Sequence, residues 1–298
     1  MKKLIRIGLS ILVSIILVFV LLSKIEPMQI IETIRLVNIP ILALSFLAYF
    51  ILMVLRAMRF GILTSIKVKD MLPIVFFHNF MNNIVPMKLG ELTYVYLTKK
   101  KSTFKHSLSS LVLVRIIDII IIGSSLLIAL LYTRSELLNG TINYIIISLA
   151  LLFLGLVVFL TMPNLIEKIL PDKGFLGKIR NIFSFKSYPL WMILKTFALS
   201  LGCYFFMMAF TYIMFISMNL ILPVNIFLIA ISMTLLSGTI PINGIAGFGT
   251  IEGVLVLVLS IFGYPHQETI VIAFSLHILQ LIFSGIFGFF GWIRVSQR

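Results

Sequence analysis

Long apolar runs alternate with short polar connections along most of this chain. The runs are residues 4–22, 40–63, 107–132, 142–162, 188–218 and 268–293. Each approaches or exceeds the ~18–20 residues that an α-helix needs to cross a bilayer. The pattern predicts an all-α polytopic membrane protein with about six to eight transmembrane helices. No hydrophilic stretch is long enough for a soluble domain, so residues 1–298 are predicted to form a single integral membrane domain.

A shorter segment, residues 28–37, has a different pattern. Ile30, Ile31 and Ile34 share one helical face, and Gln29 and Glu32 lie elsewhere. This arrangement is typical of a short interfacial helix, which we expect on the outer surface of the membrane.

Two apolar stretches, residues 71–98 and 225–262, are interrupted by helix-breaking residues. The interrupting residues are Pro86 and Gly90 in the first stretch, and Pro241, Gly244, Gly247 and Gly249 in the second. Broken helices in a bilayer are tolerated where the backbone is buried in protein or lines a watery cavity. Basic clusters on both flanks of the first stretch predict a re-entrant hairpin that enters from the cytoplasm. The second stretch is either a re-entrant hairpin or two true spans.

The two halves of the chain show a weak correspondence. Glu91 precedes Arg115 by 24 positions, and Glu252 precedes His277 by 25. The later residue of each pair is followed at i+3 by another polar residue, Asp118 or Gln280. Since the first hairpin is expected from the inside and the second from the outside, the pattern predicts an inverted-topology repeat.

Composition and charge agree with a membrane protein. Sixty per cent of the residues are hydrophobic and only 11% are charged, against roughly 25% charged in soluble domains. The net charge of +14 comes from basic residues in the short connections, as the positive-inside rule expects, and does not suggest nucleic acid. We expect a multi-pass protein of the cytoplasmic membrane, with an uncleaved first helix and with both termini in the cytoplasm.

Only three of the ten acidic residues fall well inside apolar segments: Glu91, Asp118 and Glu252. Arg115 lies three residues before Asp118, so the two are expected to form an intramembrane ion pair on one helix face. The pair either offsets the cost of burying two charges, or Asp118 positions Arg115 to contact a lipid phosphate. Lys88 lies close to Glu91 in the first break, where it either neutralises Glu91 or is free to bind phosphate.

Other polar residues in the apolar segments also leave two interpretations open. Arg56 and Arg59 either snorkel to the membrane interface or bind a headgroup at the mouth of a cavity. Glu252 either complements the dipole of the helix that it begins or faces a cavity. His277 with Gln280 makes either a helix–helix contact or a cavity contact. No spacing of His and Cys fits a metal site, and we expect no metal and no cofactor.

Three motifs in order resemble those of a known family. They are Pro86-Met-Lys-Leu-Gly90-Glu91, Arg115-Ile-Ile-Asp118 and Pro241-Ile-Asn-Gly244-Ile-Ala-Gly247-Phe-Gly249-Thr-Ile-Glu252. The family is the lysylphosphatidylglycerol synthase transmembrane region, also called flippase-like membrane proteins. Its typical patterns are Pro-x-Arg-x-Gly-Glu, Glu-Arg-x-x-Asp and Pro-x-Pro-Gly-Gly-x-Gly-x-x-Glu. The chain departs from them at Lys88 (often Arg), at Val114 (commonly Glu), and at Ile242-Asn243 (usually Pro-Gly).

The resemblance implies a function in lipid transport. In larger relatives this domain moves an aminoacylated phospholipid between leaflets and is fused to an aminoacyl-transferase domain. The present chain resembles the flippase-like part only, which argues against lysyltransferase activity. We therefore expect a flippase or transporter of a membrane phospholipid or lipid-linked substrate, passive or ion-coupled because no ATP site is visible. The candidate substrate-binding residues are Arg56, Arg59, Lys88, Glu91, Arg115, Asp118, Glu252 and His277.

Two alternatives remain from the residues alone. One is a membrane-embedded enzyme that acts on a lipid headgroup or an isoprenoid carrier, with Glu91 or Glu252 as general base. No nucleophile–base pair is evident, so no catalytic residue is assigned. The other is a scaffold for a separate lipid-modifying enzyme.

Overall fold

The computed structural model describes residues 15–99, 101–133, 150–151, 154, 188–239 and 245–297. Within these residues all regular structure is helical, which confirms the predicted fold class. Residues 15–22 form the end of the predicted first helix. The start of that helix and the predicted span 142–162, except for residues 150, 151 and 154, lie outside the described residues.

Four helices of the described part are long and apolar enough to cross a membrane. They are α3 (Ile39–Thr64), α6 (Phe104–Thr133), α10 (Leu190–Ser217) and α13 (His266–Ser296). Their ends lie within three residues of the predicted ranges. The side chain of Asn38 caps α3 by accepting a hydrogen bond from the Ile41 N–H, and the helix ends at Ser65 with φ of 58°. Local capping and turn residues therefore set the two ends of α3.

The two interrupted stretches form two hairpins of shorter helices. The first consists of α4 (Val68–Ile84), the 3₁₀ turn η1 (Pro86–Lys88) and α5 (Glu91–Thr98). The second consists of α11 (Val224–Ser237), the 3₁₀ turn η4 (Ile245–Gly247) and α12 (Thr250–Ile261). With 14 and 12 residues, α11 and α12 are each shorter than the ~20 residues of a full span, and they pack against each other. Of the two interpretations of residues 225–262, the structure therefore selects the hairpin.

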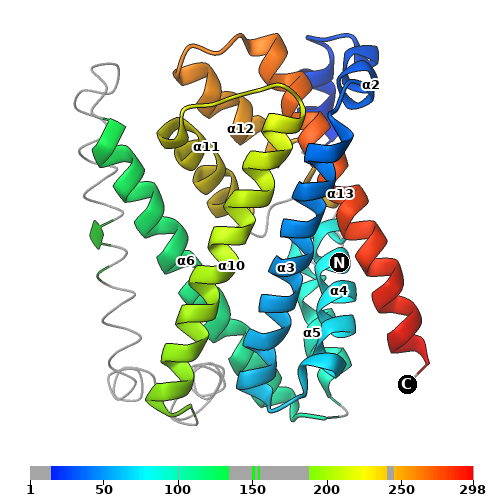
Figure 1. The fold of residues 1–298 in the computed structure, drawn as a ribbon, viewed down its shortest axis with the longest axis vertical. Helices are drawn as coiled ribbons and strands as arrows, with labels where there is room; N and C mark the ends of the chain where they lie inside the picture. The colour runs from blue at the N-terminus through cyan, green and yellow to red at the C-terminus, as the bar shows by residue number, and fades with distance from the viewer. Residues whose placement is uncertain are drawn as a thin grey trace, which may run out of the picture.

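The hairpins lie at opposite ends of the bundle. In Figure 1, α4 and α5 occupy the lower half of the molecule, and α11 and α12 occupy the upper half. The chain runs down the picture in α3 and α13 and up it in α6 and α10. Each long helix of the first half therefore has an oppositely directed counterpart in the second, α10 for α3 and α13 for α6.

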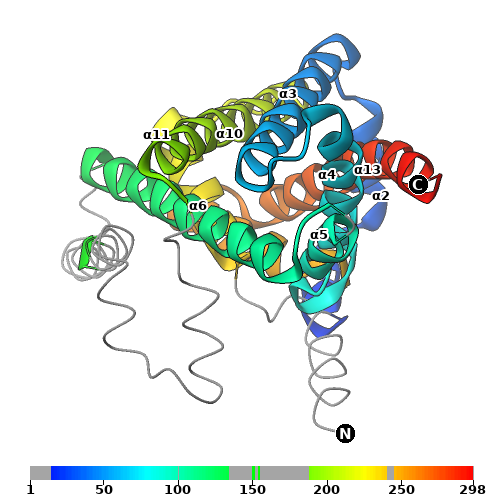
Figure 2. The ribbon, with the colours of Figure 1, turned by 90° about the horizontal axis from the view of Figure 1, so that it is seen from below.

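The contacts between elements follow the same relation. Helix α3 packs against its counterpart α10, and η1 packs against η4. Helix α4 packs against α13, and α11 packs in the equivalent way against α6. Viewed from the lower end (Figure 2), α3 and α10 lie side by side, and α4 lies between α3 and α13. This is the arrangement of an inverted-topology repeat.

Close packing of α4 on α13 holds the first hairpin in place. A Cβ added to Gly288 would lie 2.4 Å from the Phe80 side chain. One added to Gly291 would lie 2.7 Å from the backbone of Phe77 and Pro73. Small residues allow this close approach of helices, as is common within membranes.

The predicted interfacial helix is present as α2 (Pro27–Arg35). Ile30 is its buried residue, and α2 packs against α13 at the end of the bundle opposite the first hairpin.

Candidate functional site

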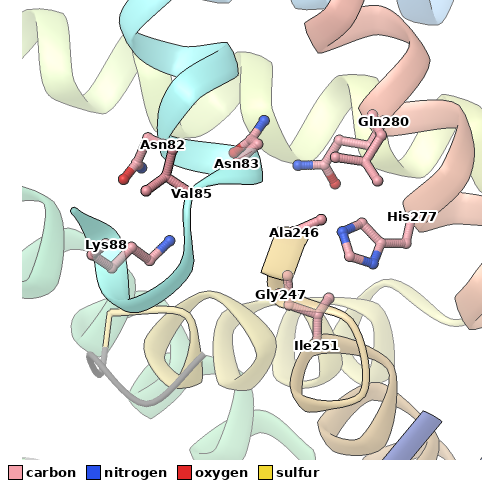
Figure 3. Close-up of a pocket in the computed structure, with 10 residues that line it drawn as sticks. Asn82, Asn83, Val85, Lys88, Ala246, Gly247, Ile251, His277 and Gln280 are labelled. Carbon is pink, nitrogen blue, oxygen red and sulfur yellow. The ribbon is translucent and has the colours of Figure 1, made fainter. Parts of the chain in front are cut away.

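The two broken hairpins meet around a small pocket (Figure 3). The first hairpin contributes Asn82, Asn83, Val85 and Lys88; the second contributes Ala246, Gly247 and Ile251; α13 contributes His277, Gln280 and Leu281. Figure 3 shows Lys88 and Asn82 on one side and His277 and Gln280 on the other. The pocket thus brings together residues that are almost 200 positions apart in the sequence.

The first break is built by three residues of the Pro86-to-Glu91 motif. Pro86 begins the turn η1. A Cβ on Gly90 would lie 2.3 Å from the carbonyl oxygen of Met81, so only glycine fits where the chain folds back on α4. Lys88 adopts a left-handed conformation, with φ of 56°. Non-glycine residues in this region are uncommon, and they cluster at ligand sites and switch regions.

The second break uses left-handed backbone in the same way. Gly247 and Gly249 have φ of 75° and 84°, and Ala246 has φ of 54°. Left-handed backbone therefore occurs at Gly247 and Gly249, two of the positions where the sequence predicts a break. Pro241 and Gly244, the other two predicted breaks, lie outside the described residues.

The predicted ion pair between Arg115 and Asp118 is wrong, as is the neutralisation of Glu91 by Lys88. Arg115 Nη2 lies 2.6 Å from Glu91 Oε1, and Asp118 pairs with Arg59 instead. Positions i and i+3 share a helix face, but Arg115 faces the start of α5 and Asp118 faces α3. An opposite charge on a neighbouring helix competes with the local partner at each position.

Arg59 does not snorkel, so that interpretation is also wrong. Its side chain is buried, and Nη1 and Nη2 donate to the two oxygens of Asp118 at 2.5 and 3.3 Å. Nη1 also donates to Ser200 Oγ at 2.9 Å. Arg56 likewise turns inward, and its Nη1 donates to Asn79 Oδ1 at 2.6 Å. A guanidinium at this depth is stabilised by its fixed partners rather than by water.

Glu252 is fully buried and engaged through both oxygens. Oε2 accepts a hydrogen bond from the backbone N–H of Gly249 at 2.8 Å, and Oε1 lies 2.5 Å from His277 Nδ1. Glu252 therefore caps α12 and also joins α12 to α13 beside the pocket. Since Glu91 contacts Arg115 and Glu252 contacts His277, the similar spacings in the two halves correspond to equivalent contacts.

Lys88 differs from the other charged residues of this region. Within the part of the chain that the structure describes, it makes no hydrogen bond and no ion pair. The charges of Arg115, Glu91 and Arg56 all act on it, so it lies within electrostatic reach of these three residues. The hydrogen-bond partners of Arg56 among the described residues are the amide of Asn79 and the thioether of Met207.

Three asparagines of α4 belong to the site but were not among the predicted site residues. Asn79 bonds Arg56 and also donates to Tyr49 Oη at 2.7 Å. Asn83 donates to Ser284 Oγ at 3.0 Å. Asn82 lines the pocket. The signal in the sequence was the i, i+4 spacing of Asn79 and Asn83 within an apolar segment, which places both on one helix face.

The spanning helices, the oppositely inserted hairpins and the buried ion pairs define an integral membrane protein of the polytopic all-α class. Residues 7–288 match the model of the lysylphosphatidylglycerol synthase TM region family. The chain therefore belongs to this family, which is associated with lipid handling. Comparison with curated proteins and with solved structures gave no match.

Proposed function

We propose that this protein is a flippase or transporter that moves a phospholipid or a lipid-linked substrate across the cytoplasmic membrane. The observation that carries the proposal is the pocket between two broken hairpins that enter from opposite ends of the bundle. In transporters with inverted repeats, substrate binds at such a repeat interface near the bilayer midplane. Rocking of one half against the other then exposes the site to each leaflet in turn.

The charge distribution supports an orientation for this transport. The end of the bundle that carries the first hairpin is basic, with Lys67, Lys69, Lys99, Lys101, Lys105 and Arg294. The connection between α10 and α11, at the other end, has no charged residue. By the positive-inside rule the basic end, with the C-terminus, faces the cytoplasm. The first hairpin then enters from the cytoplasm and the second from outside.

The pocket also suits a phosphate-bearing headgroup. Lys88 lies at its wall and has no ion-pair partner among the described residues, and Arg115, whose charge acts on Lys88, has a side chain that is 36% exposed. A phosphate can compete with Glu91 for the planar guanidinium, which matches it in a bidentate manner. Arg59 and Asp118 are then scaffold residues, because the Arg59 side chain is only 4% exposed and already bound.

Transport is favoured over membrane-embedded catalysis because of how the two candidate bases are held. Glu252 uses one oxygen for Gly249 and the other for His277. Glu91 is held by Arg115. A general base needs a free lone pair within hydrogen-bond reach of the substrate proton. Glu252 is fully buried and so lies out of reach of a substrate proton, and Glu91 joins α5 to α6 through Arg115.

The test is movement of labelled phospholipids in proteoliposomes that contain the purified protein. Wild-type protein is expected to expose inner-leaflet label to a membrane-impermeant quencher faster than protein-free vesicles do. Lys88→Asn and Arg115→Gln each remove a charge-assisted contact of about 1.5–3 kcal/mol, so they are expected to slow the movement by about tenfold or more. Asparagine suits Lys88 because it tolerates a positive φ.

Lys101→Gln is the matched control, since Lys101 pairs with Asp70 and does not line the pocket. Loss of this ion pair is expected to leave the rate of lipid movement unchanged. Rates equal to those of empty vesicles, or unaffected by both pocket variants, would refute the proposal. Conversion of the added lipid by the purified protein alone would instead support an enzyme.

A further inference from the structure

We infer that the pocket takes a headgroup that is a hydroxyl-bearing phosphodiester with net negative charge, in preference to one that carries a cationic amine. This inference rests on the proposed function, because it names the substrate class of the same site.

The first argument concerns the acids of the described membrane interior. Glu91 is bound by Arg115, Asp118 by Arg59, and Glu252 by His277 and the Gly249 N–H. A substrate ammonium group would need a carboxylate to offset its loss of hydration in a low-dielectric site. At this site it could gain one only by displacing an arginine or a histidine that is already in place.

The second argument concerns the bases. Four cationic side chains of the described chain share this region: the charges of Arg115 and Arg56 act on Lys88, and the charge of Arg59 acts on Arg56. Arg59 and Arg115 are matched by carboxylates, whereas no carboxylate in the described part of the chain pairs with Lys88 or Arg56. The region therefore has an excess of positive charge. A phosphodiester carries a single negative charge and so balances this excess, whereas a cationic amine adds to it.

The third argument concerns hydroxyl groups. Asn82 lines the pocket, and its Oδ1 is buried with no hydrogen-bond partner among the described residues. Buried polar atoms are nearly always hydrogen-bonded, so this oxygen calls for a donor. Figure 3 shows Asn82 and Lys88 on the same wall of the pocket. A rotation of the Asn82 side chain that turns this oxygen toward the pocket would let a headgroup with its phosphate at Lys88 donate a neutral hydroxyl to it without adding positive charge.

The opposite wall fits the same ligand. Gln280 projects toward the pocket from α13 and offers an amide, which can both donate and accept hydrogen bonds. Asn83 supplies a second neutral amide from α4. Polyhydroxyl groups are well matched by such amides, because each hydroxyl donates one hydrogen bond and accepts others.

Binding tests the inference without requiring transport. Purified protein in detergent is mixed with four lipids of identical acyl chains: phosphatidylglycerol, lysyl-phosphatidylglycerol, phosphatidylethanolamine and phosphatidylcholine. Native mass spectrometry then measures the bound fraction of each. Phosphatidylglycerol is expected to bind about tenfold or more tightly than the lysyl lipid, a difference that corresponds to about 1.4 kcal/mol. Equal binding, or preference for the lysyl lipid, would overturn the inference even if transport were observed.

Variants locate the preference at the pocket. Lys88→Asn is expected to lower phosphatidylglycerol binding about tenfold, toward that of phosphatidylcholine, whereas Lys88→Arg keeps the preference because it keeps the charge. Lys101→Gln is expected to bind as wild type. An unchanged preference in Lys88→Asn, in protein that melts like wild type, would show that the inferred site is wrong.

Soluble glycerophosphoglycerol distinguishes a lipid from a free phosphate ester. At concentrations equal to that of the lipid it is expected not to displace phosphatidylglycerol, since it lacks acyl chains. Full displacement would overturn the assignment to a lipid headgroup. Absence of lipid movement in proteoliposomes, with the binding preference intact, would refute the proposed function but not the headgroup class.

Discussion

Asp118 is expected to contribute to stability chiefly through Arg59. Arg59 is 3% exposed, so replacing Asp118 with alanine leaves a buried guanidinium without its carboxylate. The three hydrogen bonds of this guanidinium reach Asp118 on α6 and Ser200 on α10, and Arg59 itself is on α3. One interaction network therefore joins three spanning helices.

The magnitude follows from burial. Removing one partner of a buried ion pair costs about 3–5 kcal/mol. The Asp118 side chain is 23% exposed, which places Asp118→Ala near the lower end, at about 3 kcal/mol. Ser200→Ala leaves the ion pair intact and is expected to cost about 1.5–3 kcal/mol, the range for a hydrogen bond to a charged group. In the Lys101–Asp70 pair, Lys101 is 44% exposed, and Lys101→Ala is expected to cost at most about 1 kcal/mol.

Equilibrium unfolding of the purified protein in detergent measures these differences. Lys101→Ala serves as the exposed control. The double variant Arg59→Met/Asp118→Leu is expected to be more stable than Asp118→Ala, because apolar side chains replace the unpaired charge. The reasoning is refuted if Asp118→Ala destabilises no more than Lys101→Ala does. It is refuted equally if the double variant is no more stable than Asp118→Ala.

Three further predictions concern the hairpins. Gly90→Ala is expected to lower the melting temperature and reduce lipid movement, because the new Cβ would lie 2.3 Å from a carbonyl oxygen of α4. Gly253→Ala is the control: its new Cβ has no atom within 4 Å, so the variant is expected to be neutral or to stabilise α12 by up to ~1 kcal/mol. Equal melting temperatures of the two variants would contradict this prediction. Exchange of the charges at Glu91 and Arg115 is expected to recover part of the stability that either single charge reversal loses. The coupling energy in a double-mutant cycle is expected to be about 0.5–3 kcal/mol. A coupling energy of zero would show that the Glu91–Arg115 contact does not contribute to stability. Glu252→Gln keeps a hydrogen-bond acceptor for the Gly249 N–H at the start of α12, and Glu252→Ala does not. The alanine variant is therefore expected to be less stable than the glutamine variant by about 1 kcal/mol in denaturant unfolding. The opposite order would contradict the capping contact.

The helices and their interruptions could be predicted from the sequence. The bounds of α3, α6, α10 and α13 follow the apolar runs to within three residues. The breaks near Gly90 and Gly247 were visible because glycine and proline interrupt otherwise apolar stretches. Both signals are local, since every backbone polar group in a membrane must be satisfied within its own segment or a close neighbour.

The partners of the buried charges could not be predicted in the same way. Arg115 and Asp118 are close in sequence, yet each binds a residue from another part of the chain. The spacings of 24 and 25 positions separate residues that prove to be in contact, Glu91 with Arg115 and Glu252 with His277. A spacing shows that two halves correspond, but it does not show which side chains touch.

The sequence by itself determined the class of the protein, the places where its helices break and the presence of three interior acids, since these depend on composition and local pattern. Only the tertiary structure decided that all three acids are engaged, that Lys88 has no ion-pair partner among the described residues and that both breaks face one pocket. Those outcomes depend on how closely helices approach. That approach is set by packing such as Gly288 against Phe80, between residues about 200 positions apart.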